Sequence, residues 1–243
     1  MAGQLPSFLG LGTQKGGTTT LHRLLAGHPQ VFLPHCKEVH YFDLNAEMPR
    51  SWYAQHFSGA GPDQQCGEIT PFYLFHPEVP KRIKALLPQA RLIVLLRDPV
   101  ERTLSQVFHA RERGFEPLSP GEALAIEADR LADGNLFSFQ KHSYLSRSHY
   151  LEQLDRYEAL FAPEQLLVLR SEDLFASPAP LWKELQRFLG LSSIQLPDDL
   201  PRANAGKGLS STVDPILRSS LRESLRSTAE GIRQRYGFGW DWA

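Results

Sequence analysis

The 243-residue sequence predicts an α/β fold in which helices flank a central parallel β-sheet in three layers. The first observation is a set of short apolar runs without alternation, such as Arg91–Leu96, which are typical of strands covered on both faces. The second is that helical patterns separate these runs. The third is that two strand-to-helix turns carry glycines, hydroxyls and cations. Because ligands bind beyond the carboxyl ends of parallel strands, both turns lie where a binding site is expected.

The elements of the N-terminal half follow from the apolar runs and their breakers. A buried strand is expected over Ser7–Gly12, and a helix with three leucines on one face over Gly17–Ala26. The Gly-His-Pro tripeptide at 27–29 ends this helix. A weaker strand is expected over Cys66–Ile69, and a helix over Val79–Leu87.

The C-terminal half follows from the central strand onward. Asp98 provides a helix cap, Pro99 suits the first helical position and Glu101 completes a capping box. A helix over Val100–Arg113 is therefore expected. The later elements are helix Tyr144–Phe161, strand Gln165–Leu169, helix Leu181–Leu189 and a last helix between Pro215 and Gly237. The length fits a single domain, 1–243, with a sizeable core.

The composition excludes several classes of function. A formal net charge of −1 argues against nucleic-acid or anionic-membrane binding, so any anion site must be local. No apolar stretch approaches the roughly 18 residues that span a bilayer, and the N-terminus is unlike a signal peptide. Cys36 and Cys66 are too few for a disulfide framework, and the nine histidines form no recognisable metal motif. We therefore expect a cytoplasmic protein without a metal.

The turn from Gly12 to Thr20 has the composition of an anion-binding loop. Its paired glycines let the backbone approach an anion, and the following helix supplies N–H groups and the positive end of its dipole. Three threonine hydroxyls add further donors. An ordinary turn with a helix cap is the alternative, but such a turn requires neither three threonines nor a lysine.

This loop is P-loop-like but departs from the Walker pattern, in which Gly and four residues precede Gly-Lys-Ser/Thr. Gly12 and Gly17 have the required separation, but Thr18 stands where the Walker lysine belongs. The lysine, Lys15, lies ahead of the glycine pair instead. A Walker-B aspartate is also missing, because Arg97 follows the central strand. The pattern therefore disfavours an ATP or GTP hydrolase.

A second anion site is expected directly after the central strand. Arg97 stands at the carboxyl end of the strand, and Ser105 lies about two helical turns further on. An arginine fork beside a hydroxyl can hold a terminal phosphate. A surface ion pair between Arg97 and Asp98, with an unrelated serine, explains this motif equally well, and the residues alone leave both interpretations open.

Together the two loops resemble those of sulfotransferases that use 3′-phosphoadenosine 5′-phosphosulfate (PAPS), of the heparan sulfate N- and 3-O-sulfotransferase type. Four more segments, spread over nearly the whole chain, are similar to this family: Lys37–Asp43, Gly67–Tyr73, Ala205–Gly208 and Phe238–Trp242. The resemblance implies a sulfotransferase with PAPS as co-substrate, adenosine 3′,5′-bisphosphate (PAP) as product and no required metal. The implied acceptor is a hydroxyl or amine of a saccharide or small metabolite.

The resemblance assigns nucleotide contacts to three segments. The implied contacts of the 5′-phosphosulfate are Lys15, Gly16, Gly17, Thr18, Thr19 and Thr20. Those of the 3′-phosphate are Arg97 and Ser105. A late loop with Lys207 and Gly208 is implied to close over the nucleotide.

The resemblance also assigns the chemistry. Glu38 is implied as the general base for the acceptor proton, and Lys15 as the cation that stabilises the leaving phosphate. His40 would orient Glu38 or contact the acceptor, with a satisfied half-buried histidine as the alternative. Asp43 would contact the acceptor or support His40. Without the resemblance, Glu38 is interpreted as a solvated carboxylate paired with Lys37.

Departures from the family pattern limit what the resemblance implies. Ile69 replaces a lysine of some relatives, and Thr19 matches the N-sulfotransferase form rather than the 3-O form. Heparan specificity is therefore not assumed. Two other functions stay open: a nucleotide-dependent small-molecule kinase with a degenerate P-loop, and a non-catalytic module that binds PAPS or PAP. The sequence carries no signal for an oligomeric state.

Overall fold

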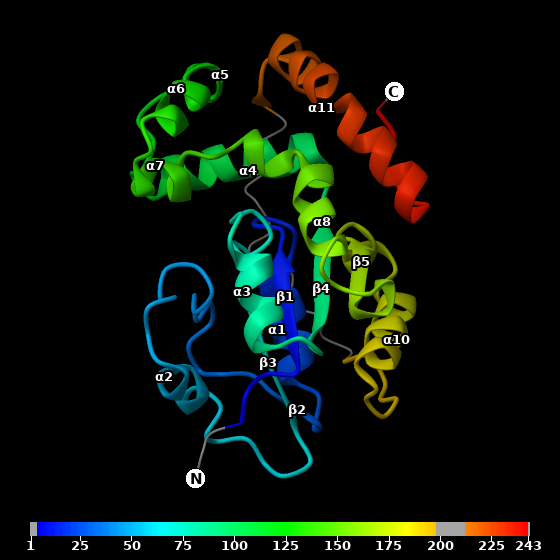
Figure 1. The fold of residues 1–243 in the computed structure, drawn as a ribbon. Coiled ribbons are helices and arrows are strands. Elements are labelled where there is room, and N and C mark those ends of the chain that lie inside the picture. Colours follow the sequence, from blue (N-terminus) through cyan, green and yellow to red (C-terminus); the bar gives the residue numbers. More distant parts are fainter. Residues whose placement is uncertain (1–3, 198–211, 243) are drawn as a thin grey trace. The chain divides into compact units, whose positions relative to one another are not determined.

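The computed structural model describes residues 4–197 and 212–242, in which five parallel strands form a sheet of order β2-β3-β1-β4-β5 (Figure 1). The strands are β1 (Phe8–Gly12), β2 (Val31–Phe32), β3 (Gln65–Ile69), β4 (Arg91–Leu96) and β5 (Leu166–Arg170). The predicted parallel sheet is confirmed. β1 lies at its centre, so the loop that follows β1 emerges from the middle of the carboxyl edge.

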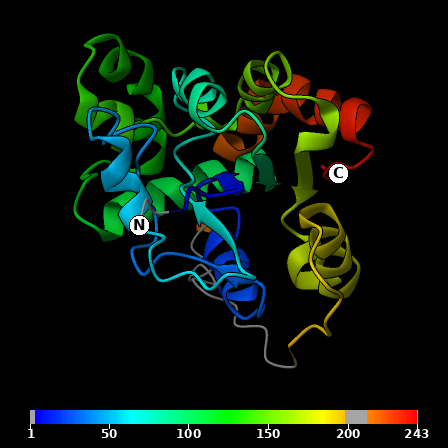
Figure 2. The same cartoon turned by 60° about the horizontal axis from the view of Figure 1, so that its bottom comes forward.

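Helices cover the sheet on both sides. On one side, leucines of α1 (Thr18–Ala26) and α10 (Pro178–Leu189) form a buried cluster with side chains from all five strands. α3 (Val79–Leu86) lies on the other side of the strands, as Figure 2 shows. Burial on both faces explains why β1 and β4 are continuous apolar runs rather than alternating ones.

The described residues form two compact units. The first contains residues 4–96 and 153–197, and the second contains residues 97–152 and 212–242. The remaining helices of the first unit are α2 (Arg50–Gln55), η2 (Pro163–Gln165) and α9 (Asp173–Ala176). Those of the second are α4 (Pro99–Glu112), α5 (Pro120–Ala125), α6 (Glu127–Ala132), α7 (Leu136–Lys141), η1 (Ser146–Ser148) and α11 (Pro215–Tyr236). The chain returns to the first unit within α8 (Tyr150–Glu158). The single domain expected over 1–243 stays a prediction.

The core of the second unit is built on α4 and α11. Buried apolar side chains of α4 pack against Leu221 and Leu225 of α11. Asp98 caps α4 by accepting hydrogen bonds from the backbone N–H groups of Val100 and Glu101, at 2.8 and 3.0 Å. The cap predicted at Asp98 is therefore confirmed and fixes the backbone immediately after Arg97, whereas the carboxylate of Glu101 pairs with Arg218.

The structure differs from the predicted elements in several places, among them β2, α2 and α9, which the sequence does not predict. The sequence does not predict α5, α6 and α7, because each has six residues, too few to show a helical period. The helix expected over Tyr144–Phe161 is shorter, since α8 begins at Tyr150. Ser146–Ser148, within the expected helix, form the separate 3-10 helix η1, which ends at His149 with a non-helical ψ of 75°.

Candidate active site

The loop after β1 is held in place from two neighbouring strands. Thr13 donates to the carbonyl oxygen of Leu95 on β4 through both its backbone N–H, at 2.8 Å, and its hydroxyl, at 3.0 Å. The hydroxyl of Ser171, which follows β5, donates to the carbonyl of Gly16 at 2.8 Å. A Cβ atom at Gly16 would lie 2.5 Å from the Thr13 hydroxyl and 2.7 Å from the Leu95 carbonyl oxygen. Glycine is therefore required at this position.

The start of α1 has the features of an anion site. Gly17 precedes the helix with a φ of 88°, a left-handed conformation that favours glycine. Gly17 provides no side-chain cap, and the start of the helix with its positive dipole end suits an anion. Thr19 is half-buried and Thr18 is 6% exposed, whereas Thr20 is fully buried. Thr20 therefore contributes to the interior as well as to the predicted site.

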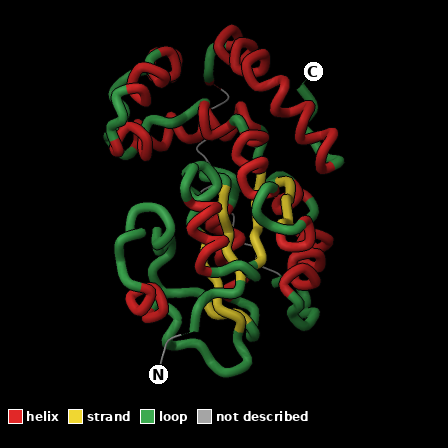
Figure 3. The backbone as a smooth tube through the Cα atoms, in the orientation of Figure 1, coloured by secondary structure: helices red, strands yellow, loops and turns green. Residues whose placement is uncertain are grey.

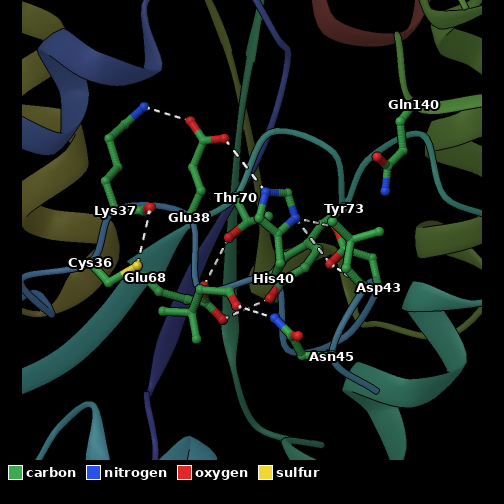
Figure 4. Close-up of polar contacts among 12 residues, drawn as sticks. Cys36, Lys37, Glu38, His40, Asp43, Asn45, Glu68, Thr70, Tyr73 and Gln140 are labelled. Atoms are coloured by element: carbon green, nitrogen blue, oxygen red, sulfur yellow. Dashed lines mark hydrogen bonds and ion pairs between the residues drawn. The ribbon is translucent and has the colours of Figure 1, made fainter. Parts of the chain in front are cut away.

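Glu38, His40 and Asp43 are brought together on the segment that follows β2. Figure 3 shows this part of the chain, between β2 and α2, as loop throughout. His40 Nδ1 lies 2.8 Å from Asp43 Oδ2, and His40 Nε2 lies 3.7 Å from Glu38 Oε2 (Figure 4). Lys37 Nζ donates to Glu38 Oε1 at 2.7 Å. The imidazole therefore lies between two carboxylates. This arrangement suits the first role that the resemblance implies for His40, the orientation of Glu38.

The charges in this group perturb each other's ionisation. Burial alone would raise the pKa of Glu38, but hydrogen bonds with His40 and Lys37 outweigh it and lower the pKa to about 2. Burial alone would lower the pKa of His40, but Asp43 and Glu38 raise it to about 9. At neutral pH Glu38 is therefore a carboxylate and His40 an imidazolium.

Two residues that the sequence interpretation missed hold this segment in shape. Arg82 on α3 donates from Nη1 to the carbonyl of Phe42 at 2.9 Å. Asn45 donates from Nδ2 to the carbonyl of Val39 at 3.0 Å. Neither contact has a sequence signal, because each depends on how the loop folds back on itself or on a distant helix.

Helix α1 and the Glu38 segment are electrostatic neighbours. The pKa of His22 on α1 is lowered first by burial and then by the charge of Lys37, while the charge of Glu38 opposes this effect. Charges more than about 10 Å apart are largely screened by salt. The helix that begins at the anion loop and the Lys37–Glu38 pair therefore belong to one region of the first unit.

The residues predicted for the 3′-phosphate lie in the second unit. Arg97 follows β4 directly and is half-buried, and Ser105 is half-buried on α4. Tyr150 donates from its hydroxyl to the carbonyl of Arg97 at 2.8 Å, which fixes the backbone of this turn. Lys207 and Gly208, predicted for the late loop, lie outside the described residues.

The described residues contain no group of three or more His, Cys, Asp or Glu side chains that could hold a metal ion. Among those same residues, no helix combines the length and the apolar character that crossing a bilayer requires.

Known proteins share this sequence pattern. A model of the sulfotransferase domain family matches residues 6–205. Human heparan sulfate glucosamine 3-O-sulfotransferase 5 is 30% identical over 77% of this chain and 54% of its own length. Human bifunctional heparan sulfate N-deacetylase/N-sulfotransferase 3 is 33% identical over 77% of this chain and 22% of its own. The chain therefore spans about half of the first relative and about a fifth of the second.

A solved structure shares the fold over almost the full length. A sulfotransferase from Alicyclobacillus acidocaldarius superposes with a TM-score of 0.83 at 26% identity, covering 98% of both chains. The family match over residues 6–205 includes the loop after β1, the Glu38 segment and the Arg97 turn.

Proposed function

This chain belongs to the sulfotransferase family, and on that premise we propose that it transfers a sulfuryl group from PAPS to a hydroxyl or amine of a saccharide or small metabolite. One observation carries the proposal. Among the described residues, the non-glycine residues with positive φ are Lys15, Glu38 and His40, at 69°, 65° and 57°. Such conformations cost about 1–3 kcal/mol each and are concentrated at functional sites. These are the three residues to which the sequence resemblance assigns the chemistry.

The donor would be bound through both anion loops. The 5′-phosphosulfate would lie against the backbone of Gly16 and Gly17 at the uncapped start of α1, with Lys15 beside it. Thr18 and Thr19 would add hydroxyl donors. The 3′-phosphate would be held by the guanidinium of Arg97 and the hydroxyl of Ser105. Two separate phosphate sites favour a nucleotide that carries both groups over ATP.

In the proposed step the acceptor oxygen or nitrogen attacks sulfur while the bond between sulfur and the phosphate oxygen breaks. The electron pair of that bond stays on the phosphate of PAP, where Lys15 would stabilise the developing charge. The acceptor proton passes to the carboxylate of Glu38. The products are the sulfated acceptor, PAP and protonated Glu38, which then releases its proton to water.

A base with the low pKa of Glu38 suits this chemistry if it acts late. A carboxylate with a pKa of about 2 is a weak base toward a free alcohol, but it is ionised throughout the neutral range. As the new bond to sulfur forms, the acceptor oxygen gains positive charge and becomes strongly acidic. Transfer of that proton is then thermodynamically favourable even to a weak base such as Glu38.

His40 has a supporting role in this scheme. Because its pKa is raised to about 9, the imidazolium predominates at neutral pH and has no electron pair for the acceptor proton. Its Nδ1–H donates to Asp43, and its Nε2–H points toward Glu38. His40 would therefore orient Glu38, and Asp43 would fix the orientation of His40.

The environment of Ile69 favours an acceptor with little negative charge. Its side chain is 1% exposed and packs in the cluster beneath α1 and α10. Position 69 therefore offers no cation to an anionic acceptor, unlike the lysine of some relatives. We infer an acceptor of small size or low charge rather than a long polyanionic glycan.

A label-transfer assay tests the proposal. Incubation with PAPS carrying radioactive sulfur and a library of saccharides, phenols and amines should yield a labelled acceptor. A PAPS or PAP sensor would bind the nucleotide without transfer, and a kinase would instead transfer phosphate from ATP. Equal affinity for ATP and PAPS in calorimetry, together with no labelled product, would contradict the proposed function.

A further inference from the structure

A buried carboxylate surrounded by hydroxyl groups lies next to the Glu38 segment. Glu68 on β3 is 1% exposed. The hydroxyls of Tyr53 and Tyr73 donate to its Oε1 at 2.5 and 2.9 Å, and the Thr70 hydroxyl donates to its Oε2 at 2.8 Å (Figure 4). Both oxygens are thus occupied by side chains from three different places in the sequence.

Burying a carboxylate in a sheet costs desolvation free energy. Burial raises the pKa of Glu68, and the hydrogen bonds from Tyr53, Thr70 and Tyr73 act against this rise. An apolar side chain of similar size would avoid the desolvation cost, so stability alone does not explain a carboxylate here. What the carboxylate does provide is a fixed position for two tyrosine hydroxyls.

Both tyrosines also contact the dipeptide Tyr41–Phe42. The hydroxyl of Tyr73 accepts a hydrogen bond from the backbone N–H of Phe42 at 3.3 Å. The ring of Tyr53 stacks on that of Tyr41, with centroids 4.1 Å apart and planes at 3°. The Phe42 ring packs edge-on against both tyrosines. Each tyrosine therefore links Glu68 to the loop, Tyr73 through its hydroxyl and Tyr53 through its hydroxyl and its ring.

This dipeptide separates His40 from Asp43, so its position sets the geometry of the candidate site. We propose that Glu68 is a positioning residue, which acts through Tyr53 and Tyr73 to hold His40 within reach of Glu38. The proposal rests on the proposed function for the roles of Glu38 and His40. Glu68 itself touches neither donor nor acceptor.

Two hydrogen bonds in series connect the sheet to the residue that precedes Asp43. The N–H of Phe42 donates to Tyr73, and Tyr73 donates to Glu68. The next residue, Asp43, accepts from the imidazole of His40. Bonds in such a series polarise and strengthen one another. Loss of one tyrosine hydroxyl would free the 41–42 peptide to shift, and a displacement of about 1 Å costs roughly a hundredfold in rate.

Tyr73→Phe and Tyr53→Phe test the proposal in the full chain, because each deletes one donor to Glu68 and keeps the ring. Tyr144→Phe is the matched control: Tyr144 is equally buried and donates to a carboxylate, that of Glu116, in the second unit. We expect kcat with an alcohol acceptor to fall roughly tenfold to a hundredfold in the two test variants. The dissociation constant for PAPS should stay at the wild-type value in all three.

A second measurement reports on the geometry of the site and does not depend on turnover. The imidazole of His40 can be titrated by NMR, and its pKa should fall from about 9 toward the ordinary 6.5 in Tyr73→Phe and Tyr53→Phe. It should not move in Tyr144→Phe. Glu68→Gln, which keeps the size of the side chain, should show the same shift where it folds.

The outcomes separate this inference from the proposed function. An unchanged His40 titration and unchanged kcat in both tyrosine variants, beside lost turnover in Glu38→Gln, would overturn the positioning role of Glu68. Equal losses in Tyr144→Phe would overturn it too, since general destabilisation would then explain them. Retained turnover in Glu38→Gln would instead remove the proposed chemistry, and the His40 titration would still decide whether Glu68 orders the loop.

Discussion

The indole N–H of Trp242 donates a hydrogen bond to Oδ2 of Asp98 at 2.7 Å, while Oδ1 of the same carboxylate caps α4. Nearby, Tyr150 donates to the carbonyl of Arg97 and its ring contacts that of Trp240, with centroids 6.3 Å apart. The C-terminal segment therefore fixes the backbone on which Arg97 stands. This segment lies beyond residues 6–205, the region that the family model matches.

Trp242→Phe should weaken binding of PAP by about fivefold, which corresponds to about 1 kcal/mol. The reason is that the Arg97 turn loses one of its supports while the guanidinium itself is kept. Isothermal calorimetry with PAP and with adenosine 5′-phosphosulfate measures the effect, which should appear only with the nucleotide that carries a 3′-phosphate.

Trp182→Phe is the control for this experiment. Trp182 also donates its indole N–H, to the carbonyl of Ile194 at 3.2 Å, but it lies in the first unit. Its loss should lower the melting temperature and leave discrimination by the 3′-phosphate unchanged. If the two variants weaken PAP equally, Trp242 acts through overall stability rather than through the Arg97 turn.

Arg97→Ala should weaken PAPS binding by about 1.5–3 kcal/mol, the usual contribution of a hydrogen bond to a charged group. The loss should largely disappear with adenosine 5′-phosphosulfate, because that nucleotide lacks the 3′-phosphate. Calorimetry with both ligands checks this expectation. An equal loss with both would show that Arg97 does not bind the 3′-phosphate.

The ionisation of His40 predicts how stability depends on pH. Its pKa is raised from 6.5 to about 9, so the imidazolium pairs contribute stability that is fully present below pH 6.5 and lost as pH rises through 9. Wild type and His40→Gln, compared by urea unfolding, should therefore differ more at pH 6 than at pH 10. The lowered pKa of Glu38 has the opposite sign, and its contribution is lost only as pH falls from 4.5 through 2. A difference that does not change between pH 6 and pH 10 would contradict the raised pKa of His40.

The sequence predicts the sheet and its two anion loops because each depends on neighbours in the chain. β4 is a continuous apolar run, and Asp98 caps the next helix two residues after it ends. β2 shows no such signal, since it has only two residues. The Glu68 network has no sequence signal either, because its tyrosines come from positions 53 and 73 and meet Glu68 only in the folded protein.

The candidate site, like the fold, could be predicted from the sequence only in part. Glu38, His40 and Asp43 lie within six residues of one another, so a single motif contains them all. What the motif does not contain is their ionisation, which follows from burial and from the distances between the charges. The prediction of a base was therefore possible from the sequence, whereas its low pKa and the charged state of His40 were not.

Glu38→Gln separates binding from chemistry. The amide keeps the shape of the side chain and still accepts a hydrogen bond from Lys37 or His40, but it does not take up a proton at neutral pH. PAPS affinity should therefore stay near the wild-type value, while turnover with an alcohol acceptor falls by roughly a hundredfold or more. Calorimetry and single-turnover label transfer measure the two quantities separately.

The choice of acceptor makes the same variant a test of when the proton moves. A nitrophenol is already acidic, so its transfer needs less help from a base, and the loss in Glu38→Gln should be smaller than with an alcohol. Lys15→Ala should behave differently and weaken both PAPS binding and turnover, because the lysine would touch the leaving phosphate before and during the step. Near-normal turnover of Glu38→Gln with an ordinary alcohol would remove Glu38 from the mechanism. His40 could then take its place only above about pH 9, where its imidazole is neutral, so a rate that rises through that pH would identify it as the base.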